Sequence, residues 1–188
     1  MKFKKLIIIL SLLILALAFL NLTTWVKSKK PENNSVGSGQ KIDFPEVRGD
    51  SLFPLIKPGQ TIKLVHDYYD NRPAERGDII AYNYAGDTAP IIKIVKAIPG
   101  DKWHLEKGNS QDGYRIIIND QPIKNSEGEF YLIPEAKIKM LEIYVQGYPI
   151  IPENTYLILG NQTAGTLDAT QFGLISKSDI LGKIEIVN

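Results

Sequence analysis

The stretch PIIKIVKAIPGD, residues 90–101, sets a run of isoleucine and valine against a Pro-Gly-Asp turn. β-Branched residues favour strands, and the turn ends the run after a strand's usual length, so the segment predicts a β-strand. Lys93 lies inside this run and shares a strand face with Ile91 and Val95. It is therefore either an edge lysine that keeps its amine in water or a buried amine whose pKa is lowered towards neutrality.

Short apolar runs of the same kind fill the chain from residue 42 onward. They are TIKLV (61–65), GDIIAY (77–82), YRIIIND (114–120), KIKMLEIYV (137–145), TYLILG (155–160) and GKIEIVN (182–188). Turn sequences separate them, and long stretches with a 3.6-residue period are absent. The pattern predicts a mostly β domain over residues 42–188, an antiparallel sheet or barrel-like arrangement with only one or two short helical turns.

The N-terminal segment has a different character. Residues 6–26 carry no charge, and a helix of 21 residues spans about 30 Å of hydrocarbon. Residues 1–26 therefore predict a transmembrane anchor in a lipid bilayer, and residues 27–41, rich in Pro, Asn, Gly and Ser, predict a flexible linker. The alternative is a cleaved signal peptide with Ala16 to Ala18 as the cleavage site.

Charge and composition exclude several classes of function. Residues 1–41 carry a net charge of +6 and residues 42–188 carry −5, so the domain lacks the basic surface of a nucleic-acid binder. The chain has no cysteine, which excludes disulfides and a thiol nucleophile. Neither a metal-binding H-E-x-x-H motif nor a glycine-rich phosphate loop is present, so we expect no cofactor and no metal.

The stretch EVRGDSLFPLIKPGQ, residues 46–60, holds a serine that is either a turn residue or a nucleophile. A serine nucleophile needs a neighbouring base. The chain has two histidines, His66 and His104, and no G-x-S-x-G elbow. His66 lies near Asp67 and Asp70, but such clusters are typical of solvated turns rather than of a catalytic triad. Serine with lysine is the combination that remains.

Four segments, in order, resemble the bacterial type I signal peptidases, a family of membrane-anchored Ser/Lys proteases. VRGDSLFPLIKPGQ (47–60) is similar to the family's nucleophile box, and RGDIIAY (76–82) to its Arg-Gly-Asp strand. IIKIVKAIPGD (91–101) is similar to the general-base box, in which the lysine stands seven residues before the glycine of Pro-Gly-Asp. GNQTAGTLDATQFGLI (160–175) has the spacing of the last box. Together they extend the resemblance over nearly the whole chain.

The resemblance implies roles for particular residues. The implied site consists of Ser51 as nucleophile, Lys93 rather than Lys96 as general base, Thr166 as the hydroxyl that orients Lys93, Gly49 and Asp50 in the nucleophile loop, and Asp168. Gly49 has no hydroxyl, so we expect backbone N–H groups to hold the oxyanion. The last box departs from the family at Asn161, Ala169 and Thr170, where Asp, Ser and Arg are usual. We interpret the loss of Asp at 161 and of Arg at 94 as an ion pair replaced by neutral contacts.

The resemblance also implies a function. A protein of this family cleaves signal peptides from exported preproteins, after a small-x-small sequence, outside the cytoplasmic membrane. The alternatives are a peptidase of the same family dedicated to one pilus or conjugation system, and a non-catalytic membrane-anchored assembly chaperone with the same fold. A binding role needs neither Ser51 nor Lys93, which argues against the chaperone.

Overall fold

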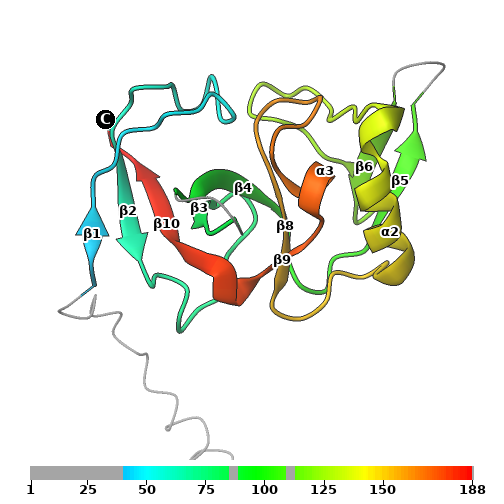
Figure 1. The fold of residues 1–188 in the computed structure, drawn as a ribbon. Coiled ribbons are helices and arrows are strands. Elements are labelled where there is room, and N and C mark those ends of the chain that lie inside the picture. The colour runs from blue at the N-terminus through cyan, green and yellow to red at the C-terminus, as the bar shows by residue number, and fades with distance from the viewer. Residues whose placement is uncertain (1–39, 85–88, 109–112, 188) are drawn as a thin grey trace, which may run out of the picture. The chain divides into compact units, whose positions relative to one another are not determined.

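The main architectural element is a seven-stranded antiparallel sheet, seen in a computed structural model that describes residues 40–84, 89–108 and 113–187. Residues 39–188 form one compact unit. The order across the sheet is β1-β2-β10-β3-β4-β8-β9 (Figure 1). The strands are β1 (Ile42–Asp43), β2 (Ile62–His66), β3 (Ile79–Tyr82), β4 (Ile91–Ala97), β8 (Thr155–Leu159), β9 (Ile175–Ser176) and β10 (Ile180–Ile186).

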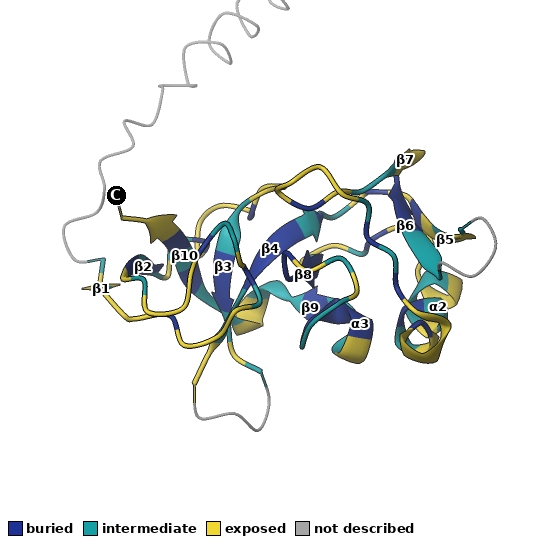
Figure 2. Ribbon diagram, turned by 90° about the horizontal axis from the view of Figure 1, so that it is seen from above, coloured by how far each residue is buried: buried dark blue, intermediate teal, exposed yellow. Residues whose placement is uncertain are grey.

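The C-terminal strand lies inside this sheet. β10 pairs on one side with β2, with Ile184 opposite Leu64, and on the other side with β3, with Ile184 opposite Ile79. Apolar side chains on the two faces of the sheet form separate cores. One contains Leu52, Ile56, Ile62, Leu64, Ala81, Ile94 and Ile184, and the other contains Tyr69, Ala74, Ile80, Val95, Tyr156, Ile158 and Ile175. Figure 2 shows the buried residues concentrated on β3, β4, β8 and β9.

A smaller three-stranded sheet packs with the helices around a third core. It contains β5 (Trp103–Lys107), β6 (Tyr114–Ile118) and β7 (Gln121–Pro122), and Trp103 and Ile116 are buried there. The helices are α2 (Lys139–Gly147) and α3 (Ala169–Phe172), with 3-10 turns at Glu135–Lys137 and Lys177–Asp179. The antiparallel β class predicted from the sequence is confirmed; the larger sheet has two end strands, β1 and β9.

One predicted strand is wrong. The run KIKMLEIYV forms most of α2, a nine-residue helix. Leu141 is fully buried and Tyr144 and Val145 pack against the same core, which is the spacing of one helix face. A short apolar run fits either period, and here the contacts with the third core decide for the helix.

The predictions for residues 1–26 and for most of the linker lie outside the described residues. Within the described part of the chain, no helix is long and apolar enough to cross a membrane.

Candidate active site

Ser51 follows a short extended segment that is fixed along one edge. Val47 donates its N–H to the carbonyl of Gln60 (2.9 Å) and accepts one from Gly59 (2.7 Å). Directly after Ser51 the chain turns, and Leu52 and Ile56 are buried in the core beneath. These anchors fix the backbone on both sides of the serine, so that its half-buried hydroxyl has a defined position.

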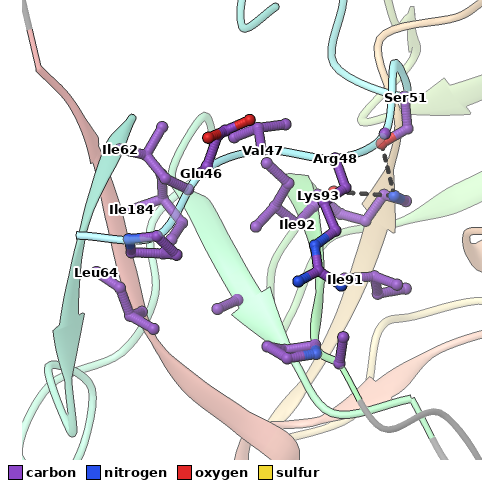
Figure 3. A pocket seen from close by; sticks show the side chains of 15 residues that line it. Glu46, Val47, Arg48, Ser51, Ile62, Leu64, Ile91, Ile92, Lys93 and Ile184 are labelled. Atoms are coloured by element: carbon purple, nitrogen blue, oxygen red, sulfur yellow. Dashed lines mark hydrogen bonds between the residues drawn. The ribbon is translucent and has the colours of Figure 1, made fainter. Parts of the chain in front are cut away.

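Lys93 comes from the middle of β4 and is 3% exposed. Its Nζ lies 2.9 Å from Ser51 Oγ and 2.9 Å from the carbonyl oxygen of Ile92 (Figure 3). Burial lowers the pKa of Lys93 from its ordinary value of 10.5 to about 8, and the nearby Asp168 carboxylate opposes part of that shift. The edge-lysine interpretation is therefore wrong, because this amine is buried against a serine.

Asp168 is a fully buried carboxylate with five hydrogen bonds. One oxygen accepts the N–H of Gly160 (2.9 Å) and both the N–H and the hydroxyl of Thr166 (3.1 and 2.7 Å). The other accepts the N–H and the hydroxyl of Thr170 (3.0 and 2.8 Å). Thr170 stands where the family usually has arginine, and its hydroxyl donates a hydrogen bond to Asp168.

The contact predicted for Thr166 needs a correction. Among the described residues, the hydrogen bonds of the Lys93 amine go to Ser51 and Ile92, whereas the Thr166 hydroxyl donates to Asp168. The Thr166 hydroxyl donates its one proton to the Asp168 carboxylate, and among the described residues its oxygen accepts no hydrogen bond from the Lys93 amine. In this structure Thr166 thus affects Lys93 through the Asp168 carboxylate.

Gly160 and Asn161, just after β8, contact the loop that holds Ser51. Asn161 donates its N–H to the carbonyl of Ser51 (2.6 Å), and its side-chain amide donates to the carbonyl of Phe53 (3.1 Å) and to Ser126 Oγ (2.8 Å). A Cβ on Gly160 would clash with the Thr166 hydroxyl and lie 2.9 Å from the Ser51 carbonyl oxygen. These hydrogen bonds go to the loop that holds Ser51 and to Ser126 rather than to residue 94, so the interpretation of a replaced ion pair stays a prediction.

Two further observations concern β4, the strand that carries Lys93. Arg76 of the Arg-Gly-Asp segment donates from Nη2 to both carboxylate oxygens of Asp101 in the Pro-Gly-Asp turn (2.7 and 2.6 Å) and from Nη1 to the carbonyl of Lys96, which fixes the end of β4. Burial also lowers the pKa of Lys96 to about 8, but its Nζ bonds to the carbonyl of Lys124 (2.9 Å). Of these two lysines, Lys93 is the one whose amine is hydrogen-bonded to the Ser51 hydroxyl, as the spacing predicted.

A groove of about 950 Å³ leads away from Ser51 and Lys93. Its walls are the segment from Pro45 to Gly49 and the start of β4 at residues 90–92 (Figure 3). Its floor is apolar and comes from the sheet, through Ile62, Leu64, Ala81 and Ile184. Such a groove suits an extended chain with small or apolar side chains.

The other candidate chemistry gains no support from the geometry. His66 bonds to Asp43 on β1 (2.7 Å), rather than to Asp67 or Asp70, and does not line the groove. Within residues 40–84, 89–108 and 113–187, no three acidic or histidine side chains come close enough to hold a metal ion.

Comparisons with known proteins point to one family. A family model described as "Signal peptidase, peptidase S26" matches residues 39–188. Signal peptidase IB of Staphylococcus aureus (strain Mu50) is 26% identical over 144 residues, 73% of each chain. A second relative, the inactive signal peptidase IA of S. aureus (strain COL), is 27% identical over 142 residues, 74% of this chain and 75% of that one. A crystal structure of a signal peptidase I from Enterococcus faecalis V583 shares 19% identity, with a TM-score of 0.39, over 62% of this chain and 98% of that chain.

The family match places the chain in a class of serine peptidases. The chain belongs to the signal peptidase family, peptidase S26.

Proposed function

We propose that this protein is a membrane-anchored serine endopeptidase that removes signal peptides from exported preproteins. Ser51 is the nucleophile and Lys93 is the general base. The observation that carries the proposal is the 2.9 Å contact between Ser51 Oγ and an amine whose burial lowers its pKa to about 8. A base with a pKa near the working pH is about half neutral there and still accepts a proton readily.

The mechanism starts with proton transfer from Ser51 Oγ to the neutral amine of Lys93 as the oxygen attacks the scissile carbonyl. The resulting oxyanion is held by backbone N–H groups around Ser51, since Gly49 has no hydroxyl to offer. Lys93 then returns the proton to the leaving amine, which leaves an acyl ester on Ser51. Lys93 next takes a proton from water, the hydroxide attacks the ester, and the proton returns to Ser51 as the acid product leaves.

The substrate binds as an added strand in the groove. β4 pairs with β3 from Ile91, but its pairing with β8 begins only at Ile94, so the start of β4 has an open edge. The opposite wall, around Val47, pairs on its far side with the turn at Gly59 and Gln60. A peptide between these walls adds main-chain hydrogen bonds and places small side chains, from the residues before the scissile bond, over the apolar floor.

Residues 1–26 anchor the protein in the bilayer, and residues 42–188 lie outside the cytoplasm. The anchor is supported by the 21 uncharged residues from Leu6 to Val26. The lysines on either side of this segment nearly balance, so the orientation rests on where preproteins are cleaved.

One observation favours a second candidate, the non-catalytic assembly chaperone. A relative of similar identity carries the name inactive signal peptidase IA, so a member of this family need not cleave. Against this candidate, the chain keeps both Ser51 and Lys93 in hydrogen-bond contact.

The deciding experiment incubates the detergent-solubilised full chain with preproteins that carry a small-x-small site. We expect cleavage after that site by the wild type, none by Ser51→Ala, and unchanged cleavage by Ser178→Ala, an exposed serine that does not line the groove. Ser51→Ala keeps its fold and its membrane insertion. Normal turnover by Ser51→Ala refutes the proposal, and binding without cleavage by the wild type favours the chaperone. Several unrelated preproteins in the panel separate a general enzyme from one dedicated to a pilus or conjugation system.

A further inference from the structure

Arg48 extends into the groove beside the Ser51–Lys93 pair. It belongs to the extended segment that precedes Ser51, and it lines the same groove as Ser51 and Lys93. Figure 3 shows its side chain crossing from this segment towards Ile91 at the start of β4, with the guanidinium beside Ile91. The charge therefore lies where the added substrate strand has to pass.

No described carboxylate neutralises this guanidinium, since the ion pairs and hydrogen bonds of the described residues do not include Arg48. Glu46 lines the same groove, but its carboxylate lies towards Gly59, where Oε1 is 3.9 Å from the position of an added Cβ. In Figure 3 the Glu46 carboxylate lies near Val47, well away from the guanidinium beside Ile91.

The remaining surroundings of Arg48 also matter for its charge. The groove floor is apolar, and the pKa of Lys93 at its end is lowered to about 8. Near pH 8 the groove thus contains one permanent positive charge, on Arg48, and a lysine that is partly neutral. A carboxylate that enters the groove with the substrate would meet the planar donor fork of an arginine.

We propose that Arg48 is a specificity-determining residue that selects substrates with an acidic side chain among the few residues before the scissile bond. This inference rests on the proposed function and names its substrate class more closely. It also predicts selection against lysine or arginine at the same position, because two positive charges would meet across the groove.

The test uses a set of peptides, each with one small-x-small cleavage site. The peptides differ only in a single Glu, Gln or Lys. This residue is placed in turn at each of the five positions before the cleaved bond, except at the two small positions. We expect the wild-type chain in detergent to cleave the Glu peptide with a kcat/KM about twofold to fivefold above the Gln peptide at one of these positions, the range of a partly exposed ion pair. Arg48→Gln removes this ratio and Arg48→Glu inverts it in favour of Lys. The preference also falls as salt is raised to about 0.5 M, because screening weakens an exposed pair.

Lys102→Gln is the matched control, because it removes one exposed positive charge outside the groove, and it keeps the wild-type ratios. The same peptides are also titrated onto Ser51→Ala, with and without Arg48→Gln, and binding is followed by fluorescence anisotropy. Glu-to-Gln ratios that do not depend on residue 48 at any position overturn the inference. A chain that cleaves no peptide refutes the proposed function, and the binding ratios then still decide whether Arg48 selects acidic peptides.

Discussion

Lys93→Met provides the sharpest test of the site, because the buried amine links activity to stability. Methionine has a similar length but no charge. The pKa of Lys93 is about 8 in the folded protein and 10.5 as its ordinary value. Between these two values the folded state binds fewer protons than the unfolded state, so the free energy of unfolding rises with pH across that window.

The size of the effect follows from the two pKa values. Below pH 8 the amine is protonated in both states, and its burial lowers the free energy of unfolding by about 3 kcal/mol relative to a pH above 10.5. From pH 7 to pH 9.5, about 2 kcal/mol of that penalty disappears for one such lysine. Lys93→Met therefore loses cleavage, while its stability rises less steeply with pH than that of the wild type.

Lys96 supplies the matched control, because burial lowers its pKa to about 8 as well. Lys96→Met flattens the pH dependence of stability by a similar amount, yet it keeps cleavage, since Lys96 bonds to Lys124 rather than to Ser51. The assay is denaturant unfolding of the full chain in detergent from pH 7 to pH 9.5, followed by the fluorescence of the buried Trp103, beside a cleavage assay. An active Lys93→Met refutes Lys93 as the base, and an unchanged pH slope refutes the effect of burial on its amine.

Two further substitutions test the surroundings of Ser51, and a third experiment tests the orientation in the membrane. Asn161→Asp introduces the residue usual in the family but removes the amide that donates to Phe53 and Ser126. We therefore expect a loss of about 1–3 kcal/mol in the free energy of unfolding, measured from unfolding midpoints, and a reduced kcat. Wild-type values of both quantities would contradict the positioning role. Gly160→Ala forces the backbone away from Thr166, and we expect a loss of about 1–3 kcal/mol with weaker cleavage, whereas an unaffected enzyme would show that the loop adjusts freely. Protease added to intact spheroplasts is expected to digest residues 42–188, and digestion that requires lysis would reverse the assigned orientation.

The strands were predictable where their signal was local. The runs that became β2, β3, β4, β6, β8 and β10 are rich in Ile and Val and end in turn residues. β5 (Trp103–Lys107) was missed, because its sequence WHLEK has no β-branched residue and its only apolar residues are Trp103 and Leu105. The run that became α2 was misassigned, since only packing around Leu141 separates a short helix from a strand there.

The candidate site also contains residues that the sequence predicted and contacts that it did not. Ser51 and Lys93 were predicted from motif spacing, and the structure places them 2.9 Å apart. The bonds from Asn161 to Ser51 and Phe53 join residues more than 100 positions apart, so they leave no local pattern that the sequence could reveal. The direction of the Thr166 hydroxyl depends on the competing carboxylate of Asp168, a contact two residues away that spacing alone does not decide.

The position of β10 between β2 and β3 has a consequence for how the protein is made. Ser51 and Lys93 are synthesised well before Gly160, Asn161 and the residues of β10. A nascent chain that stops before Ile180 leaves β2 and β3 without the neighbour they share, and these contacts between distant parts of the sequence form late. The growing polypeptide therefore completes the proposed peptidase site only after β10 has been synthesised, so translation itself delays the onset of any cleavage by that site.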